Sequence, residues 1–228
     1  MIDVIIVGFF CGVIIPVVAS RFGKILPADP GMVLAHLWHK PHPPKRQEGC
    51  RYALWRYKWR KMFLFSIAWA VVMAGLFAMA SRLIGEDYII WMGIFLAVVG
   101  LLIAVDQQYF LLPDFFTIPL LFLGFGFSVI TNLITPLDSF IGALFGYILC
   151  TVSVFVMNFF RKAEFGAGDV KMVTALGAWL GYASLNMTLL LSFLFFSIWS
   201  LKRKKTMGAF GPSLGIASII VLFVTYSK

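Results

Sequence analysis

Acidic residues are scarce in this sequence. The chain of 228 residues has 10 Asp and Glu residues against 19 Lys and Arg, and charged residues make up only 13% of it. A soluble domain usually carries about 25% charged residues. Hydrophobic residues reach 61%, more than a water-soluble core could hide. These proportions exclude a cytosolic enzyme, a secreted disulfide scaffold and a disordered linker, and they indicate an integral membrane protein.

The sequence also lacks cysteine pairs and the basic N-terminal segment that is typical of a cleavable leader. Cys11, Cys50 and Cys150 are widely spaced, and two of them lie inside apolar runs. This pattern excludes a disulfide framework and a CxxC metal site. The N-terminal sequence Met1-Ile2-Asp3 lacks the basic segment that opens a signal peptide. We therefore expect the first apolar segment to remain as an anchor.

Long apolar runs are plentiful. Six of them approach the roughly 20 residues that cross a bilayer: 2–20, 62–81, 88–105, 117–135, 139–160 and 207–226. A further uncharged stretch at 172–201 would be about 45 Å long as one helix, at about 1.5 Å per residue. A hydrocarbon core is about 30 Å thick, and 181–186 has the composition of a turn. We predict an all-α polytopic membrane protein with about eight transmembrane segments, including a short hairpin at 172–201.

The basic residues predict the orientation of these segments. Ten of them lie in 21–61, which the positive-inside rule places in the cytoplasm, so the N-terminus is predicted to be periplasmic. A hairpin at 172–201 then leaves every basic residue except Arg82 and Lys228 on the cytoplasmic side. The net charge of +9 is therefore explained by topology, and we do not expect a nucleic-acid partner.

The segment 21–61 is the largest polar region. Its second part, 51–61, is basic and aromatic, which predicts an interfacial segment against anionic lipid headgroups. His36, His39 and His42 have no accompanying cysteine pair, so a solvated loop is preferred over a zinc site. We predict no metal and no cofactor.

Four acids stand out once loops and termini account for the other six. They are Asp106, Asp114, Glu164 and Asp169, all at span ends predicted to face the cytoplasm. Asp106 ends the third span, where the helix dipole disfavours a carboxylate. The alternative for Asp106 is a solvated residue just past the helix end.

Asp169 follows Gly166 and Gly168, glycines that permit close backbone approach. The alternative for Asp169 is an ordinary N-cap, and an N-cap of the fourth span explains Asp114 better than catalysis does. Asp106 ends one helix and Asp169 begins another on the same membrane face. Paired carboxyls suit aspartyl proteolysis, in which one ionised carboxyl activates a water and one protonated carboxyl polarises the scissile carbonyl.

Four motifs resemble those of a known family, the type IV prepilin peptidases. They are Asp106 to Asp114 with Thr117 and Pro119, Gly166-Ala167-Gly168-Asp169-Val170-Lys171, Ala175 to Gly181, and Ala209-Phe210-Gly211-Pro212. The order and spacing of the four motifs make the resemblance specific over about 98–216.

The resemblance implies an inner-membrane aspartyl endopeptidase that cuts the short basic leader of type IV prepilins or pseudopilins at the cytoplasmic face. Asp106 and Asp169 correspond to the catalytic pair. The motifs also contain the supporting residues Gly166, Gly168, Lys171, Pro113 and Asp114. Lys171 is expected to hold the loop or to lower the pKa of Asp169.

The N-terminal part departs from the family. Many members carry two CxxC pairs after the first span, associated with zinc and N-methylation, whereas this loop has only Cys50. A Cys₄ site cannot form within one chain, which argues against N-methylation. Gln108 also replaces a basic residue found in many members. We divide the chain into a degenerate methyltransferase-like region at 1–85 and a peptidase domain at 86–228.

Two other classes of function compete with the peptidase. A transporter or proton-coupled channel would carry acids deep within spans and repeated halves, and the sequence shows neither. A non-catalytic assembly protein with a peptidase-like fold would not need both Asp106 and Asp169.

Overall fold

A computed structural model describes residues 2–22, 49–159, 166–203 and 208–227, and these contain helices and no strand. The elements are α1 (Ile2–Phe22), α3 (Gly49–Leu83), the short 3₁₀ helix η1 (Glu86–Tyr88), α4 (Ile89–Tyr109), α5 (Asp114–Thr131), α6 (Pro136–Phe159), α7 (Ala167–Arg203) and α8 (Gly211–Tyr226). Among them, six are long and apolar enough to cross a membrane, and α8 is a shorter apolar helix. The protein is a multi-pass, all-α membrane protein, as predicted.

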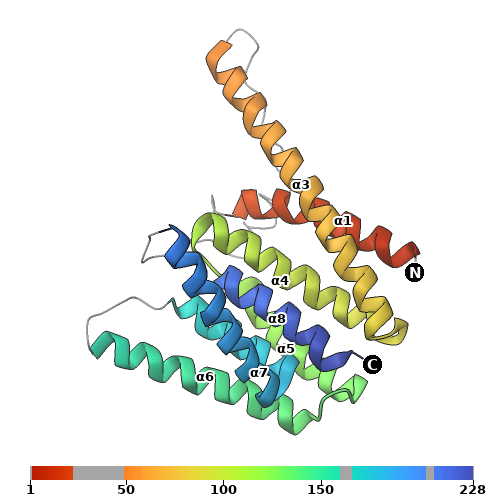
Figure 1. The fold of residues 1–228 in the computed structure, drawn as a ribbon, viewed down its shortest axis with the longest axis vertical. Helices are drawn as coiled ribbons and strands as arrows, with labels where there is room; N and C mark the ends of the chain where they lie inside the picture. Colours follow the sequence, from red (N-terminus) through yellow and green to blue (C-terminus); the bar gives the residue numbers. More distant parts are fainter. Residues whose placement is uncertain (1, 23–48, 160–165, 204–207, 228) are drawn as a thin grey trace.

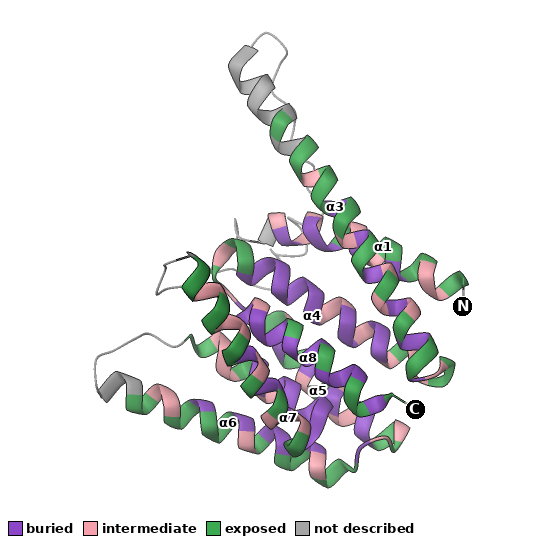
Figure 2. Cartoon of the chain, in the orientation of Figure 1, coloured by how far each residue is buried: buried purple, intermediate pink, exposed green. Residues whose placement is uncertain are grey.

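The exposed surface of the bundle is apolar. Figure 2 shows α4 as mostly buried, whereas α6 presents an exposed side along its length. Large side chains such as Phe140, Leu144 and Phe155 lie on that exposed side. An all-round apolar helix whose outer side is exposed is suited to lipid rather than to water. The core is formed by α4, α8 and the first part of α7, which carry most of the fully buried side chains.

Close helix contacts at glycines pack α1 against α3. A Cβ on Gly12 would lie 2.5 Å from the Trp69 carbonyl oxygen, and one on Gly8 would lie 2.8 Å from the Phe77 side chain. Phe77 also fills the space left by Gly93 of α4. Small residues that let helices approach are a common feature of membrane bundles. They join the N-terminal pair of helices directly to α4.

Helix α3 is longer than the 62–81 expected from hydropathy. Its 35 residues correspond to about 52 Å at 1.5 Å per residue, and Figure 1 shows its first part projecting beyond the bundle. The basic segment 51–61 is therefore continuous with the span, rather than a separate interfacial helix. The three histidines of 23–48 lie outside the described residues.

Helix α7 reverses its direction at Gly181, where φ is 74° and ψ is 175°. Contacts between α7 and α8 on both sides of Gly181 establish the reversal. Trp179, before the turn, accepts a hydrogen bond from the Tyr226 hydroxyl at the end of α8, and Ser184, after the turn, lies 3.0 Å from Thr225. Trp199, further on, lies at Gly208, beside the start of α8.

The predicted hairpin is therefore confirmed, and Figure 1 shows the chain folding back at this point. The turn is tighter than the expected 181–186, because helix resumes directly after the one non-helical residue. A positive φ favours glycine. Asp138 of α6 lies against the turn and accepts a hydrogen bond from the Tyr182 N–H at 3.4 Å.

The bounds of the fourth and the last span also differ from the sequence-based prediction. The fourth span, expected at 117–135, is α5 at Asp114–Thr131, because Asn132 adopts a left-handed conformation with φ of 55° and ends the helix. The last span, expected at 207–226, begins only at Gly211, where Pro212 opens the helix. Apolar residues on both sides of these boundaries conceal them in a hydropathy profile.

Candidate active site

Asp106 occupies the last turn of α4, which ends at Tyr109. Its side chain is buried, with 5% of the residue exposed. The carbonyl oxygen of Asp106 accepts the N–H of Phe110, which ends the helix in a left-handed conformation. The Oδ2 atom accepts a hydrogen bond from the backbone N–H of Gly211 at 2.9 Å. The span predicted to end at 105 thus continues past Asp106 and carries its carboxyl into the bundle.

Asp169 lies in the first turn of α7, as its third residue. Its N–H donates to the Gly166 carbonyl oxygen at 3.0 Å, and a Cβ on Gly166 would lie 3.3 Å from Asp169 Oδ2. A Cβ on Gly168 would lie 2.8 Å from the Leu112 Cβ. The two glycines therefore allow the start of α7 to pack tightly against the segment that joins α4 to α5, as the sequence indicated.

The two carboxyls lie close enough for the charge of Asp106 to act on Asp169. Residues 63 positions apart in the sequence are thus brought together by the C-terminal end of α4 and the N-terminal end of α7. Two neighbouring carboxyls in a largely buried place can share one proton, which provides an acid and a base at the same time.

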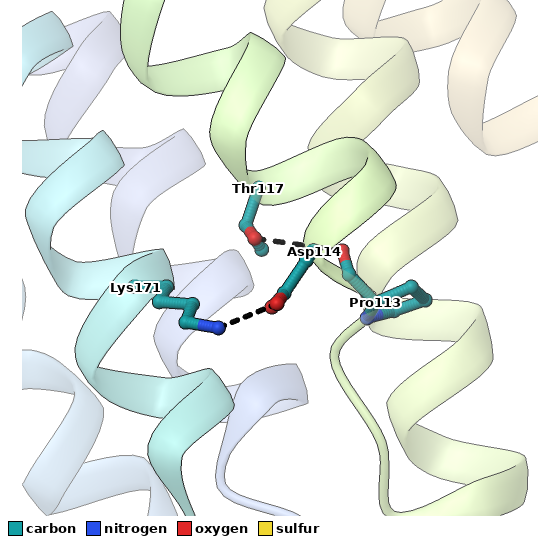
Figure 3. A network of polar contacts seen from close by, with 4 residues as sticks. All are labelled: Pro113, Asp114, Thr117 and Lys171. Carbon is teal, nitrogen blue, oxygen red and sulfur yellow. Dashed lines mark hydrogen bonds and ion pairs between the residues drawn. The ribbon is translucent and has the colours of Figure 1, made fainter. Parts of the chain in front are cut away.

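Asp114 and Lys171 form an ion pair beside this site, with Lys171 Nζ 2.6 Å from Asp114 Oδ2 (Figure 3). The structure assigns the N-cap of α5 to Pro113, so Asp114 is the first helical residue rather than the predicted cap. The Thr117 hydroxyl donates to the Pro113 carbonyl oxygen at 3.4 Å. Of the two roles expected for Lys171, the geometry fits holding the loop, because its ammonium joins α7 to α5.

Gly211 is the contact that sequence reasoning missed. The sequence marks Gly211 only as part of the fourth motif, and 105 positions separate Gly211 from Asp106. Any residue except proline has a backbone N–H, so such a donor cannot be recognised from the sequence. The only signal is the glycine, which leaves room for the contact. Of the four acids singled out, Glu164 lies outside the described residues.

The described residues contain no group of three or more His, Cys, Asp or Glu side chains that could hold a metal ion. Cys11 and Cys150 are both free thiols. The histidines at 36, 39 and 42 lie outside the described part of the chain, as does the side chain of Cys50.

Residues 93–201 match the model of the type IV leader peptidase family. A prepilin leader peptidase/N-methyltransferase of Klebsiella pneumoniae is 37% identical over 100 residues, which are 43% of this chain and 44% of that protein. The protein of the same name from Escherichia coli K12 is 38% identical over 125 residues, 52% of this chain and 56% of that protein. No solved structure gives a significant match.

The resemblance seen in the motifs is therefore confirmed over the segment that holds both Asp106 and Asp169. The chain spans about half the length of the curated relatives it matches, or less, with 41% of the relative from Neisseria gonorrhoeae as a further example.

Proposed function

We propose that this chain is a membrane-embedded aspartyl endopeptidase that removes the short basic leader from type IV prepilins or related pseudopilins. The observation that carries the proposal is that the end of α4 with Asp106 and the start of α7 with Asp169 lie close enough for the charges of the two carboxyls to interact. Both residues fall in the segment that matches the type IV leader peptidase family. The paired carboxyls supply the chemistry, and the family match supplies the class of substrate.

In the proposed reaction, the ionised carboxyl takes a proton from a water that attacks the scissile carbonyl carbon. The protonated carboxyl donates a hydrogen bond to the carbonyl oxygen as negative charge develops there. Collapse of the tetrahedral intermediate breaks the C–N bond, and the leaving amine takes up a proton. One water is consumed, and the pair returns to its singly protonated state.

The proposed location is the bacterial inner membrane, with the N-terminus in the periplasm and the active site at the cytoplasmic face. The links that join the site residues lie at one end of the bundle, and the Gly181 turn with Asp138 lies at the other end. The positive-inside rule assigns the site end to the cytoplasm. A substrate whose basic leader precedes an apolar helix would present its cleavage point at this level.

We propose peptidase activity without N-methylation, because the segment 21–61 has a single cysteine. The names of the curated relatives include N-methyltransferase, but the family match begins at residue 93. We retain the division into a region at 1–85 and a peptidase domain at 86–228. We also retain anionic lipid headgroups as the partner of 51–61, where basic residues would lie near the membrane surface.

Co-expression with a prepilin tests the proposal. The wild-type chain should convert the prepilin to a faster-migrating product, whereas Asp106→Asn and Asp169→Asn should each abolish conversion while the protein still inserts. Asp138→Asn is the matched control, because Asp138 is also an acid at a helix end but lies at the opposite end of the bundle. Normal conversion by either active-site variant would refute the paired mechanism. Mass spectrometry of the new N-terminus separately reports methylation.

A further inference from the structure

The burial of Asp106 poses an electrostatic problem. Its carboxyl lies at the C-terminal end of α4, where the unpaired carbonyl groups carry partial negative charge. The residue is 5% exposed, so water does little to offset that repulsion. A group that donates to the carboxyl is needed to keep it in one position.

The start of α8 provides that group. The first N–H groups of a helix have no partner within it, and the dipole there is positive. Pro212 has no N–H, so the donor that faces Asp106 comes from the residue before it. The Gly211 N–H lies 2.9 Å from Asp106 Oδ2, and this hydrogen bond is buried.

A side chain at position 211 would collide with the carboxyl. A Cβ there would lie 2.6 Å from Asp106 Oδ2 and 2.9 Å from its Cγ. Both atoms are tightly packed, and real Cβ atoms almost never approach so closely. Glycine at this position therefore lets the backbone of α8 reach the carboxyl, rather than supplying an unusual dihedral angle.

Aromatic side chains fix the segment that carries Gly211. The Phe210 ring lies 5.5 Å from Phe193 and 5.6 Å from Phe196, both in the second arm of α7. Gly208 lies directly against Trp199 of the same arm. The part of α7 after Gly181 thus fixes where α8 begins, and this in turn fixes the position of the Gly211 N–H.

We propose that Gly211 is a positioning residue for Asp106, whose backbone N–H holds the carboxyl in the orientation that the reaction requires. This inference rests on the proposed function, since it describes how one member of the catalytic pair is held. It also gives the Ala209-Phe210-Gly211-Pro212 motif a physical role: Phe210 anchors the segment, Gly211 donates, and Pro212 opens the helix.

The kinetic test compares Gly211→Ala with Gly215→Ala in purified full-length protein and a fluorogenic prepilin peptide. Gly215 is one turn further along α8, and its Cβ would meet Ile103 Cγ1 of α4 at 2.5 Å. Both variants therefore push the same two helices apart, but only the first displaces the carboxyl. We expect Gly211→Ala to lower kcat about 100-fold, the scale of a small misplacement of a reacting group, with KM nearly unchanged. Equal losses in the two variants, or normal kcat in Gly211→Ala, would overturn the proposal.

A stability cycle tests the contact without relying on cleavage. Asp106→Ala removes the two atoms nearest to the new Cβ, so Gly211→Ala should lower Tm less in the Asp106→Ala background than in wild type. Gly215→Ala should lower Tm equally in both backgrounds. Additive effects for position 211 would refute the contact. If the wild-type chain cleaves no prepilin but the coupling is found, the proposed function fails while the Gly211–Asp106 contact stands.

Discussion

Lys171 of α7 reaches Asp114 of α5, with its Nζ atom 2.6 Å from the carboxylate Oδ2. The ion pair joins the start of α5 to the start of α7, as Figure 3 shows. Both side chains are about half exposed. An exposed pair of this kind contributes little to stability, about 0–1 kcal/mol. Its value lies in fixing the position of Lys171, two residues from Asp169.

Exchanging Asp114 and Lys171 tests whether Lys171 acts by linking α5 to α7 or by placing its positive charge near Asp169. Lys171→Met and Asp114→Asn should each slow prepilin cleavage several-fold and lower stability by less than about 1 kcal/mol. The double variant Asp114→Lys with Lys171→Asp should recover much of the lost rate, because the link between α5 and α7 is restored. Initial cleavage rates at low salt provide the measurement. A double variant that is slower than both single variants would show that Lys171 acts as a charge on Asp169.

Gly168→Ala should impair cleavage, because the new Cβ would lie 2.8 Å from the Leu112 Cβ and displace the start of α7. A displacement of about 1 Å can cost about 100-fold in rate. Gly75→Ala is the matched control in a helix, since a Cβ there meets nothing within 4 Å. Rates and Tm values for the two variants should be compared. Undiminished cleavage in Gly168→Ala would show that cleavage does not require the close contact between Gly168 and Leu112.

Trp179→Phe should reduce stability by about 1–2 kcal/mol, through a lost hydrogen bond and a small cavity. Trp179 is fully buried, donates its indole N–H to the Leu120 carbonyl oxygen at 2.8 Å, and stacks on Phe127. Trp91→Phe, at a half-buried ring nearby, should cost less. Unfolding of the purified protein in detergent gives both values. Equal losses would mean that the indole hydrogen bond contributes nothing measurable.

The hairpin and the proposed orientation predict that two positions of α7 are accessible from opposite sides of the membrane. In a background with its three cysteines replaced, Tyr182→Cys should react with a membrane-impermeant maleimide from the periplasm, because it lies at the Gly181 turn and is 42% exposed. Lys202→Cys, at the far end of the returning arm, should react only after lysis. Labelling of Lys202→Cys in intact cells would invert the proposed orientation. Protection of Tyr182→Cys on both sides would argue against a turn at the surface.

Much of this fold is predictable from sequence because its determinants are local. Apolar runs of spanning length locate most of the helices, and the excess length of 172–201 reveals the hairpin. The basic segment 51–61 was separated from its span because hydropathy records apolarity and not helix propensity, whereas α3 runs through both. The start of α5 was placed three residues too late, since the helix opens with the charged Asp114.

The candidate pair was predictable because acids are few, whereas its supports were not. Asp106 and Asp169 are two of only four acids left at span ends, and their positions and motifs single them out. The Gly211 N–H and the link between Asp114 and Lys171 depend on which helix ends meet, and no local pattern contains that information. The Gly168–Leu112 contact belongs to the same class. The assignment of catalytic roles to the pair remains a prediction.

Two short helices begin at the candidate site. The first arm of α7, from Ala167 to Gly181, is about 20 Å long and α8 about 24 Å, at 1.5 Å per residue. A hydrocarbon core is about 30 Å thick, and a bilayer thins locally to meet segments of this length. Both helices begin beside the two carboxyls, so we expect the headgroup layer, and the water within it, to reach close to Asp106 and Asp169. In the proposed reaction, that water would be the nucleophile for carboxyls that the protein keeps largely buried.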